Sequence, residues 1–150
     1  MPEPRSVDVR ADVVVDAPPA ATWAAVTDWE RQGRWIPATT VRVTGGDGRS
    51  VGTTLEAFTG LGRLGFVDPM VVTRWEPPWR CEVRHTGSVV RGSGVFEVVA
   101  LPDGRSRFVW SEQLEAPGPL RWGLLAVRPV AGAAVGVALR RLAAAVTGGG

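Results

Sequence analysis

The sequence is poor in the residues from which most catalytic and metal sites are built. Its 150 residues include one cysteine, Cys81, one histidine, His85, no tyrosine and no lysine. A single cysteine excludes an intrachain disulfide. One His and one Cys also provide no His/Cys metal cluster and no recognisable Cys–His or Ser–His–Asp arrangement. We therefore expect no metal and no cofactor, and we expect Cys81 to be a small core residue on a strand.

The chain also lacks a marked excess of charge of either sign. Its 17 basic residues are all arginine and exceed the 15 acidic residues by two. The arginines form no basic block, and they do not alternate with tryptophan as in a base-stacking surface, so we expect no nucleic-acid partner. The first residues, Met-Pro-Glu-Pro-Arg-Ser, do not have the charged-then-apolar profile of a signal peptide. With the low cysteine content, this predicts a cytoplasmic protein.

Long uninterrupted apolar runs are absent as well. Residues 119–146 are rich in Ala, Leu and Val, but after Pro129 the apolar run is only about ten residues, against the ~20 that a bilayer requires. We expect a long C-terminal helix, kinked or divided at Pro129, and no transmembrane segment, while peripheral membrane contact stays open. Gly132 and Gly136 would let this helix approach the sheet or a partner helix closely, so both a monomer and a homodimer stay open.

What is present fits one folded domain. Apolar residues make up 45% of the chain and charged residues 21%, as in ordinary soluble domains. On folding, a chain of this length buries roughly 70% of the surface that its unfolded form exposes, and it needs no disulfide bonds or metal ions for stability. We predict a single ligand-binding domain over residues 1–147 and a disordered glycine tail at residues 148–150.

The order of the predicted elements indicates an α+β fold. From Val7 to Val15 the odd-numbered residues are apolar, as in a half-buried strand. Pro18 and Pro19 suit the first turn of a short helix, and Asp28 can cap a second short helical turn. Alternating segments separated by turn residues then predict further strands at residues 41–44, 53–59, 67–75, 79–86, 89–101 and 105–114. With the first strand, these make seven.

Strand parity assigns the side chains to the two faces of the sheet. Arg80, Glu82 and Arg84 share one side of their strand, so the residues between them face the other side. Applied to the last three strands, this reasoning places the following residues inside: Cys81, Val83, His85, Val90, Gly92, Gly94, Phe96, Val98, Phe108, Trp110, Glu112 and Leu114. Glycines in the middle of an inner face indicate a bend, a pocket floor or both.

His85 and Glu112 are the polar side chains that parity sends inward. Each either reaches water or a backbone partner at a sheet end, or anchors a ligand, or acts as a general acid or base in a low-dielectric cavity. A two-residue loop at Gly87-Ser88 would separate them by about four residues along the strands, on the order of 13 Å, too far for a hydrogen-bonded pair. Asp68 is a further candidate, but its face depends on whether Pro69 introduces a bulge.

An aromatic cluster occupies the segment after the first helix. Trp29, Trp35 and Ile36 fall within eight residues of one another. They predict either a hydrophobic plug that closes one end of the sheet or the rim of a ligand entrance.

Three segments resemble a known superfamily. They are Val13-Val-Val-Asp-Ala-Pro-Pro-Ala-Ala-Thr-Trp-Ala-Ala-Val-Thr-Asp-Trp29, Thr73-Arg-Trp-Glu-Pro-Pro-Trp79, and Phe108-Val-Trp-Ser-Glu112 followed by the long helix. Together they resemble the START-related helix-grip superfamily (SRPBCC), in particular its bacterial polyketide cyclase/dehydrase and lipid-transport branch. The resemblance covers residues 7–146. It implies a seven-stranded curved antiparallel sheet wrapped around a long C-terminal helix, with two short helices between strands 1 and 2.

The resemblance specifies the fold more closely than the function. Its members include lipid and sterol carriers, aromatase/cyclases of polyketide synthesis and hydrolases, and none of their catalytic sets matches this chain position by position. Our first hypothesis is binding, with or without transport, of a hydrophobic small molecule, lipid-like or polyketide-like, between the sheet and the C-terminal helix. The candidate ligand-binding residues are Trp35, Cys81, Val83, His85, Val90, Gly92, Gly94, Phe96, Phe108, Trp110, Glu112 and Leu114.

Two alternatives come from other classes. One is a polyketide cyclase or dehydratase that uses Glu112 or His85 as the acid/base, although the lack of Tyr and the scarcity of His count against it. The other is a protein-interaction or stress-response module that uses the segment 29–36 or the C-terminal helix.

Overall fold

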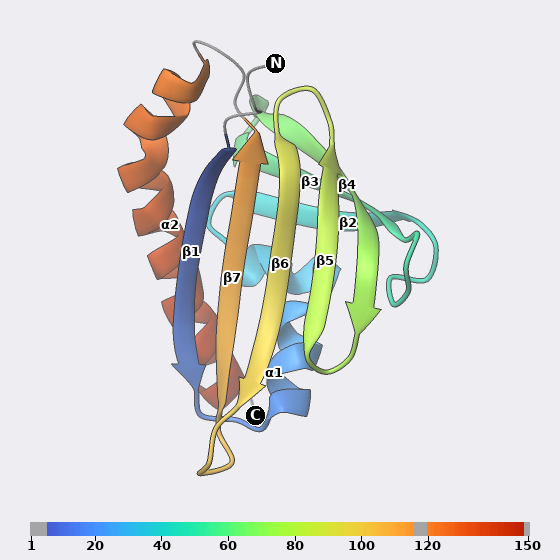
Figure 1. The fold of residues 1–150 in the computed structure, drawn as a ribbon, viewed down its shortest axis with the longest axis vertical. Coiled ribbons are helices and arrows are strands. Elements are labelled where there is room, and N and C mark those ends of the chain that lie inside the picture. Colours follow the sequence, from blue (N-terminus) through green and yellow to red (C-terminus); the bar gives the residue numbers. More distant parts are fainter. Residues whose placement is uncertain (1–5, 116–119, 149–150) are drawn as a thin grey trace.

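All seven segments predicted as strands form strands, and they join in one antiparallel sheet (Figure 1). The computed structural model describes residues 6–115 and 120–148. The strands are β1 (Ser6–Val15), β2 (Thr39–Gly45), β3 (Thr54–Leu61), β4 (Leu64–Glu76), β5 (Arg80–Thr86), β6 (Arg91–Ala100) and β7 (Ser106–Glu115). Their order is β1-β7-β6-β5-β4-β3-β2. The first two strands therefore lie at opposite edges, and the short helices between them must cross the sheet.

The two short helices are α1 (Pro19–Val26) and η1, a single stretch of 3₁₀ helix (Trp29–Arg34). Both lie behind the sheet in Figure 1. α1 begins with Pro19 at its first position, as predicted, since proline has no N–H to lose there. The predicted cap at Asp28 does not form. Its carboxylate makes no capping hydrogen bond and lies 3.6 Å from the guanidinium of Arg31 instead.

The long helix α2 (Leu120–Gly148) runs along β1 (Figure 1). It is a single helix with Pro129 inside it, so the predicted division at this proline does not occur. Gly148, predicted to belong to a disordered tail, is still part of α2, and residues 149 and 150 lie outside the described residues. The fold is thus the predicted helix-grip arrangement of a curved sheet around a long C-terminal helix.

Part of α2 is also long and apolar enough to cross a membrane. The stretch Pro129–Thr147 has a mean hydropathy of 1.5, and 17% of it is buried. However, Ala138, Leu139 and Leu142 are at most 3% exposed and belong to the hydrophobic core. A helix that contributes side chains to its own domain's core is also found in soluble folds, so the absence of a membrane span stays a prediction.

Aromatic side chains pack between the sheet and η1. Trp35 is 3% exposed, and its ring meets Phe108 and Trp110 edge-on, with centroids 6.2 and 5.9 Å apart. Phe96 lies edge-on to both rings of β7, and Trp29 stacks on Phe96 at 6.3 Å. Edge-to-face pairs of this kind add to the free energy gained from burial. The cluster therefore fixes η1 against the inner face.

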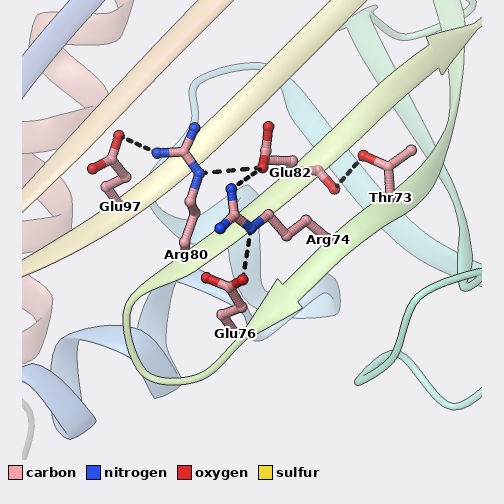
Figure 2. A network of polar contacts seen from close by, with 6 residues as sticks. All are labelled: Thr73, Arg74, Glu76, Arg80, Glu82 and Glu97. Atoms are coloured by element: carbon pink, nitrogen blue, oxygen red, sulfur yellow. Dashed lines mark hydrogen bonds and ion pairs between the residues drawn. The ribbon is translucent and has the colours of Figure 1, made fainter.

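The outer face of the sheet carries ion pairs, as strand parity predicts. Arg80 contacts Glu82 at 3.2 Å and Glu97 at 2.9 Å, and Arg74 contacts Glu76 at 2.7 Å and Glu82 at 3.1 Å (Figure 2). These pairs are partly exposed, so each adds little stability. They show which face of β5 and β6 points away from the core.

One predicted register is right and one is wrong. β6 and β7 pair as expected, with Leu101 and Arg105 joined by a backbone hydrogen bond of 2.9 Å. Between β5 and β6 the loop has four residues rather than two, so Thr86 faces Arg91. The register therefore slips by two residues relative to the prediction. Because the slip is even, no side chain changes face.

Candidate functional site

A cavity of about 150 Å³ lies between the inner face of the sheet and η1. Its apolar wall comes mainly from Val41, Leu55, Ala57, Met70, Val83 and Phe96, and the described residues that close it on the other side are Trp29, Gln32 and Ile36. Among the described residues, η1 and the segment after it cover this cavity, while α2 packs along β1. The predicted cavity between the sheet and the C-terminal helix stays a prediction.

One end of this cavity is charged. His85, near the end of β5, has both ring nitrogens 2.9 Å from a carboxylate oxygen: Nδ1 from Asp68 Oδ1 and Nε2 from Glu112 Oε2. Asp68 lies near the start of β4 and Glu112 near the end of β7, so all three belong to the same end of the sheet, the upper end in Figure 1. Only 5% of the His85 side chain is exposed, against 13% for Asp68 and 20% for Glu112.

Glu112 reaches His85 across the intervening strand. β6 lies between β5 and β7, and the residue of β6 directly opposite Glu112 is Gly94. A side chain at Gly94 would meet both carboxylate oxygens of Glu112. The second oxygen, Oε1, accepts a hydrogen bond of 2.8 Å from the indole N–H of Trp110. Because Gly94 has no side chain, the Glu112 side chain has room to cross β6 and reach His85.

The two carboxylates keep His85 protonated. Burial alone would lower the pKa of the imidazole, but the hydrogen bonds and Coulombic attraction from Asp68 and Glu112 outweigh burial and raise the pKa to about 9. At neutral pH the three groups therefore hold two negative charges and one positive charge. A histidine in this state is a poor general base near neutral pH, because it already carries its proton.

Most polar hydrogens that line the cavity are already in use. The indole N–H of Trp29 donates to the Gly48 carbonyl at 2.9 Å, and the Thr39 hydroxyl donates to the Pro37 carbonyl at 3.0 Å. Gln32 donates one amide N–H to the Val26 carbonyl at 2.8 Å. These three donor groups thus point away from the cavity and into the protein.

Cys81 lines the cavity without nucleophilic character. It is 2% exposed, and burial, with a smaller effect from the charge of Glu82, raises the pKa of its thiol to about 12. Since the thiolate is the reactive form, this cysteine stays an inert thiol at physiological pH.

The structure brings seven of the twelve candidate ligand-binding residues to the cavity surface. These are Cys81, Val83, His85, Gly94, Phe96, Trp110 and Glu112. The other five do not line it: Trp35, Val90, Gly92, Phe108 and Leu114. Trp35 and Phe108 are packed behind the cavity wall in the aromatic cluster, and Val90 lies in the loop after β5. A binding role for any of them stays a prediction.

The predicted separation of His85 and Glu112 is wrong. Because of the two-residue slip between β5 and β6, His85 lies opposite Gly92 and Glu112 lies opposite Gly94, two positions apart along the sheet. The gap is short enough for a glutamate side chain to bridge. Asp68, whose face the sequence left open, points inward, because β3 and β4 stay in register across Pro69.

The cavity residues on β2 and β3 are not among the predicted site residues. Val41, Leu55 and Ala57 are buried and occupy alternate positions with polar residues between them. This alternation is a signal in the sequence from which their inward direction can be predicted.

A second, more open hollow of about 680 Å³ lies between α1, η1 and the turn at residues 47–49. Trp23, Trp29 and Trp75 contribute to its lining. Two of its carboxylates have local partners, however: Asp47 accepts hydrogen bonds from the Arg49 backbone and the Ser50 hydroxyl, and Asp28 lies 3.6 Å from the Arg31 guanidinium. The smaller cavity is the better candidate, because its polar groups converge from three strands.

No group of three His, Cys, Asp or Glu side chains that could hold a metal occurs in residues 6–115 and 120–148.

Comparisons with known proteins agree with this geometry. A family model described as polyketide cyclase / dehydrase and lipid transport matches residues 6–147. No curated protein shows a significant sequence match.

Solved structures share the fold at low sequence identity. The chain is similar to the Zhui aromatase/cyclase from Streptomyces sp. R1128, with a TM-score of 0.77, 14% identity and coverage of 95% of this chain and 94% of the other. A solution structure from Thermobifida fusca has a TM-score of 0.72, 22% identity and coverage of 93% and 92%. The di-domain aromatase/cyclase BexL of the BE-7585A biosynthetic pathway has a TM-score of 0.71 at 16% identity, with 93% of this chain matching 47% of that one. At these identities the likeness establishes the fold alone.

Proposed function

The chain belongs to the polyketide cyclase / dehydrase and lipid transport family, and on this premise we propose that it binds a hydrophobic small molecule, lipid-like or polyketide-like, in the cavity under η1. One observation carries the proposal: apolar side chains surround the cavity on most sides, while a charged triad of the buried His85 and the partly buried Asp68 and Glu112 occupies one end. Apolar walls with a few convergent polar groups are the usual composition of a small-molecule site.

The volume of the cavity limits what enters it. Ligand pockets usually enclose about 300–1,000 Å³, whereas an apolar cavity of about 150 Å³ accommodates a molecule such as benzene. The cavity found here is of the smaller size. A single ring or a short acyl segment fits it, and a larger ligand must either project from it or move η1.

A ligand screen with a blocked variant tests the proposal. Native mass spectrometry of protein purified from its own host, and a screen of lipids and polyketides by tryptophan quenching, should both reveal a bound apolar molecule, since Trp29 and Trp110 line the cavity. Ala57 is 7% exposed and lines the same space. The matched control is Ala57→Leu, which adds three carbons to the cavity and should abolish quenching while the protein stays folded. Absence of any bound species and of any quenching would contradict the proposal.

A polyketide cyclase or dehydratase activity is the second candidate. It is favoured by two carboxylates that share one histidine at the end of an apolar cavity. Because His85 is already protonated and both its nitrogens are occupied, the base in such a reaction would be the carboxylate of Glu112, with His85 holding it in place.

Two substitutions test the catalytic candidate. Glu112→Gln should abolish turnover of a poly-β-ketone thioester, and His85→Ala should reduce it by misplacing Glu112, with circular dichroism as the check on folding. Retained turnover in both variants would exclude these residues from catalysis, whereas absence of turnover in the wild type would leave binding as the function.

A further inference from the structure

The charged end of the cavity distinguishes between the polar groups of possible ligands, whereas its apolar walls do not. We propose, building on the proposed binding function, that this site selects a neutral, ring-sized molecule or moiety that donates a hydrogen bond, such as a phenol or a cyclic alcohol, and rejects carboxylates.

The first argument is that the polar end offers acceptors. Asp68 uses Oδ1 to bind His85, and among the described residues Oδ2 has no hydrogen-bond partner. Glu112 accepts one hydrogen bond at each oxygen, from His85 and Trp110, and each carboxylate oxygen has a second lone pair. Both side chains retain some exposure, 13% and 20%. A hydroxyl at this end of the cavity therefore finds an ionised acceptor, which gives the stronger kind of hydrogen bond.

The second argument is that donors for an anion are scarce. Both N–H groups of His85 are directed at carboxylates, and the indole N–H groups of Trp29 and Trp110 are committed within the protein. No arginine is among the described residues that line the cavity. A carboxylate bound here would lose its hydration and find few donors to replace it.

The third argument is charge. Of the described residues that line the cavity, those that carry charge are Asp68, Glu112 and His85, with a sum of minus one, while Cys81 stays a neutral thiol. A ligand anion would lie beside this excess in a partly dehydrated space, where like charges repel more strongly than in water. A neutral donor avoids this repulsion.

Three probes that share an ethylphenyl group and differ in one substituent separate these effects. We would titrate the whole protein at pH 7 by calorimetry with 4-ethylphenol, ethylbenzene and 4-ethylbenzoate. Phenols are neutral at this pH, because their pKa is near 10. 4-Ethylphenol should bind at least about tenfold more tightly than 4-ethylbenzoate, a difference of about 1.4 kcal/mol, and ethylbenzene should fall between them.

The variant Glu112→Gln should invert part of this order. The amide removes one negative charge and supplies an N–H donor, so 4-ethylbenzoate should gain affinity and 4-ethylphenol should lose it. If this variant does not fold, Asp68→Asn makes the same change on the other side of His85.

The outcomes separate the two levels of the proposal. If 4-ethylbenzoate binds as tightly as 4-ethylphenol, the selectivity inference is wrong while the binding function stands. If none of the three probes binds, the proposed site itself is contradicted. An unchanged order in both variants would likewise overturn the role given to the carboxylates.

Discussion

The carboxylate of Glu112 lies directly over Gly94. A Cβ atom built on Gly94 would stand 2.9 Å from each of the two Glu112 carboxylate oxygens, closer than real side chains approach. The glutamate can therefore cross β6 and bind His85 only because the strand between them carries no side chain at this position. Gly94 is therefore part of the site, because the space beside its Cα is occupied by the Glu112 carboxylate.

The first prediction follows from this contact. Gly94→Ala should push the flexible Glu112 side chain away from His85, while the extended backbone tolerates alanine. Loss of one of its two carboxylate partners should lower the pKa of His85 from about 9 toward its ordinary value of 6.5. An NMR titration of the imidazole measures this shift. The matched control is Gly132→Ala, where a Cβ meets open space, and a pKa that stays near 9 in Gly94→Ala would contradict the contact.

A neighbouring glycine should respond differently. Gly92 has a φ of +119°, and a Cβ there would overlap the backbone carbonyl of Gln113, which cannot move aside as a side chain does. Gly92→Ala should therefore lower the free energy of unfolding by more than the ~1–3 kcal/mol that a strained backbone conformation alone costs. Gly52→Ala is the control, because Gly52 also has positive φ but open space around it. Urea denaturation compares the two, and equal losses would show that the overlap is not real.

Stability should depend on pH through His85. Its pKa is raised from 6.5 to about 9 in the folded protein. Protonation therefore stabilises the fold fully below pH 6.5, and the contribution is lost as the pH rises through 9. The shift corresponds to at most about 3 kcal/mol.

The measurement compares the wild type with His85→Gln. The difference between their free energies of unfolding should be larger at pH 6 than at pH 9.5, and taking the difference cancels the titration of Cys81 in the unfolded chain. A pH-independent difference would show that the two carboxylates do not hold a charged imidazole.

The packing of α2 gives a further prediction. Leu142 is 1% exposed and lies in the core, whereas Val130, on the same helix, is 73% exposed. Leu142→Ala should lower the free energy of unfolding by about 2–5 kcal/mol, and Val130→Ala should change it by less than about 0.5 kcal/mol. Thermal or urea denaturation measures both. Equal, small effects would mean that α2 does not depend on the domain's core for its position.

The architecture could be predicted from the sequence because the same local patterns of apolar and charged residues recur in strand after strand. The alternation of apolar and charged residues in strands such as Val7–Val15 can be recognised from neighbouring residues alone. In the structure this segment forms β1. The inner and outer faces of β5 were also assigned correctly, because Arg80 and Glu82 mark the outer side. Such patterns require no knowledge of which strands pair.

The site depends on a loop length, a strand register and the packing of side chains, and no local sequence pattern specifies these. The sequence predicts a two-residue loop at Gly87-Ser88, whereas the loop at residues 87–90 has four, and this difference decides whether Glu112 lies within reach of His85. The inward direction of Asp68 rested on the register of β4 against β3 across Pro69. The position of the cavity beneath η1 depended on how Trp29 and Trp35 pack, which is a tertiary property.

The most direct test of the account locates a bound ligand by NMR. 4-Ethylphenol would be titrated into ¹⁵N-labelled protein while the seven tryptophan indole signals are followed, each assigned by a Trp→Phe variant. Trp29 and Trp110 line the cavity, Trp23 and Trp75 line the larger outer hollow together with Trp29, and Trp79 is 48% exposed and lines neither. We predict saturable shifts of the Trp29 and Trp110 signals, lost in Ala57→Leu. Shifts confined to Trp23, Trp75 or Trp79, or no shift at any concentration, would contradict binding in the cavity under η1.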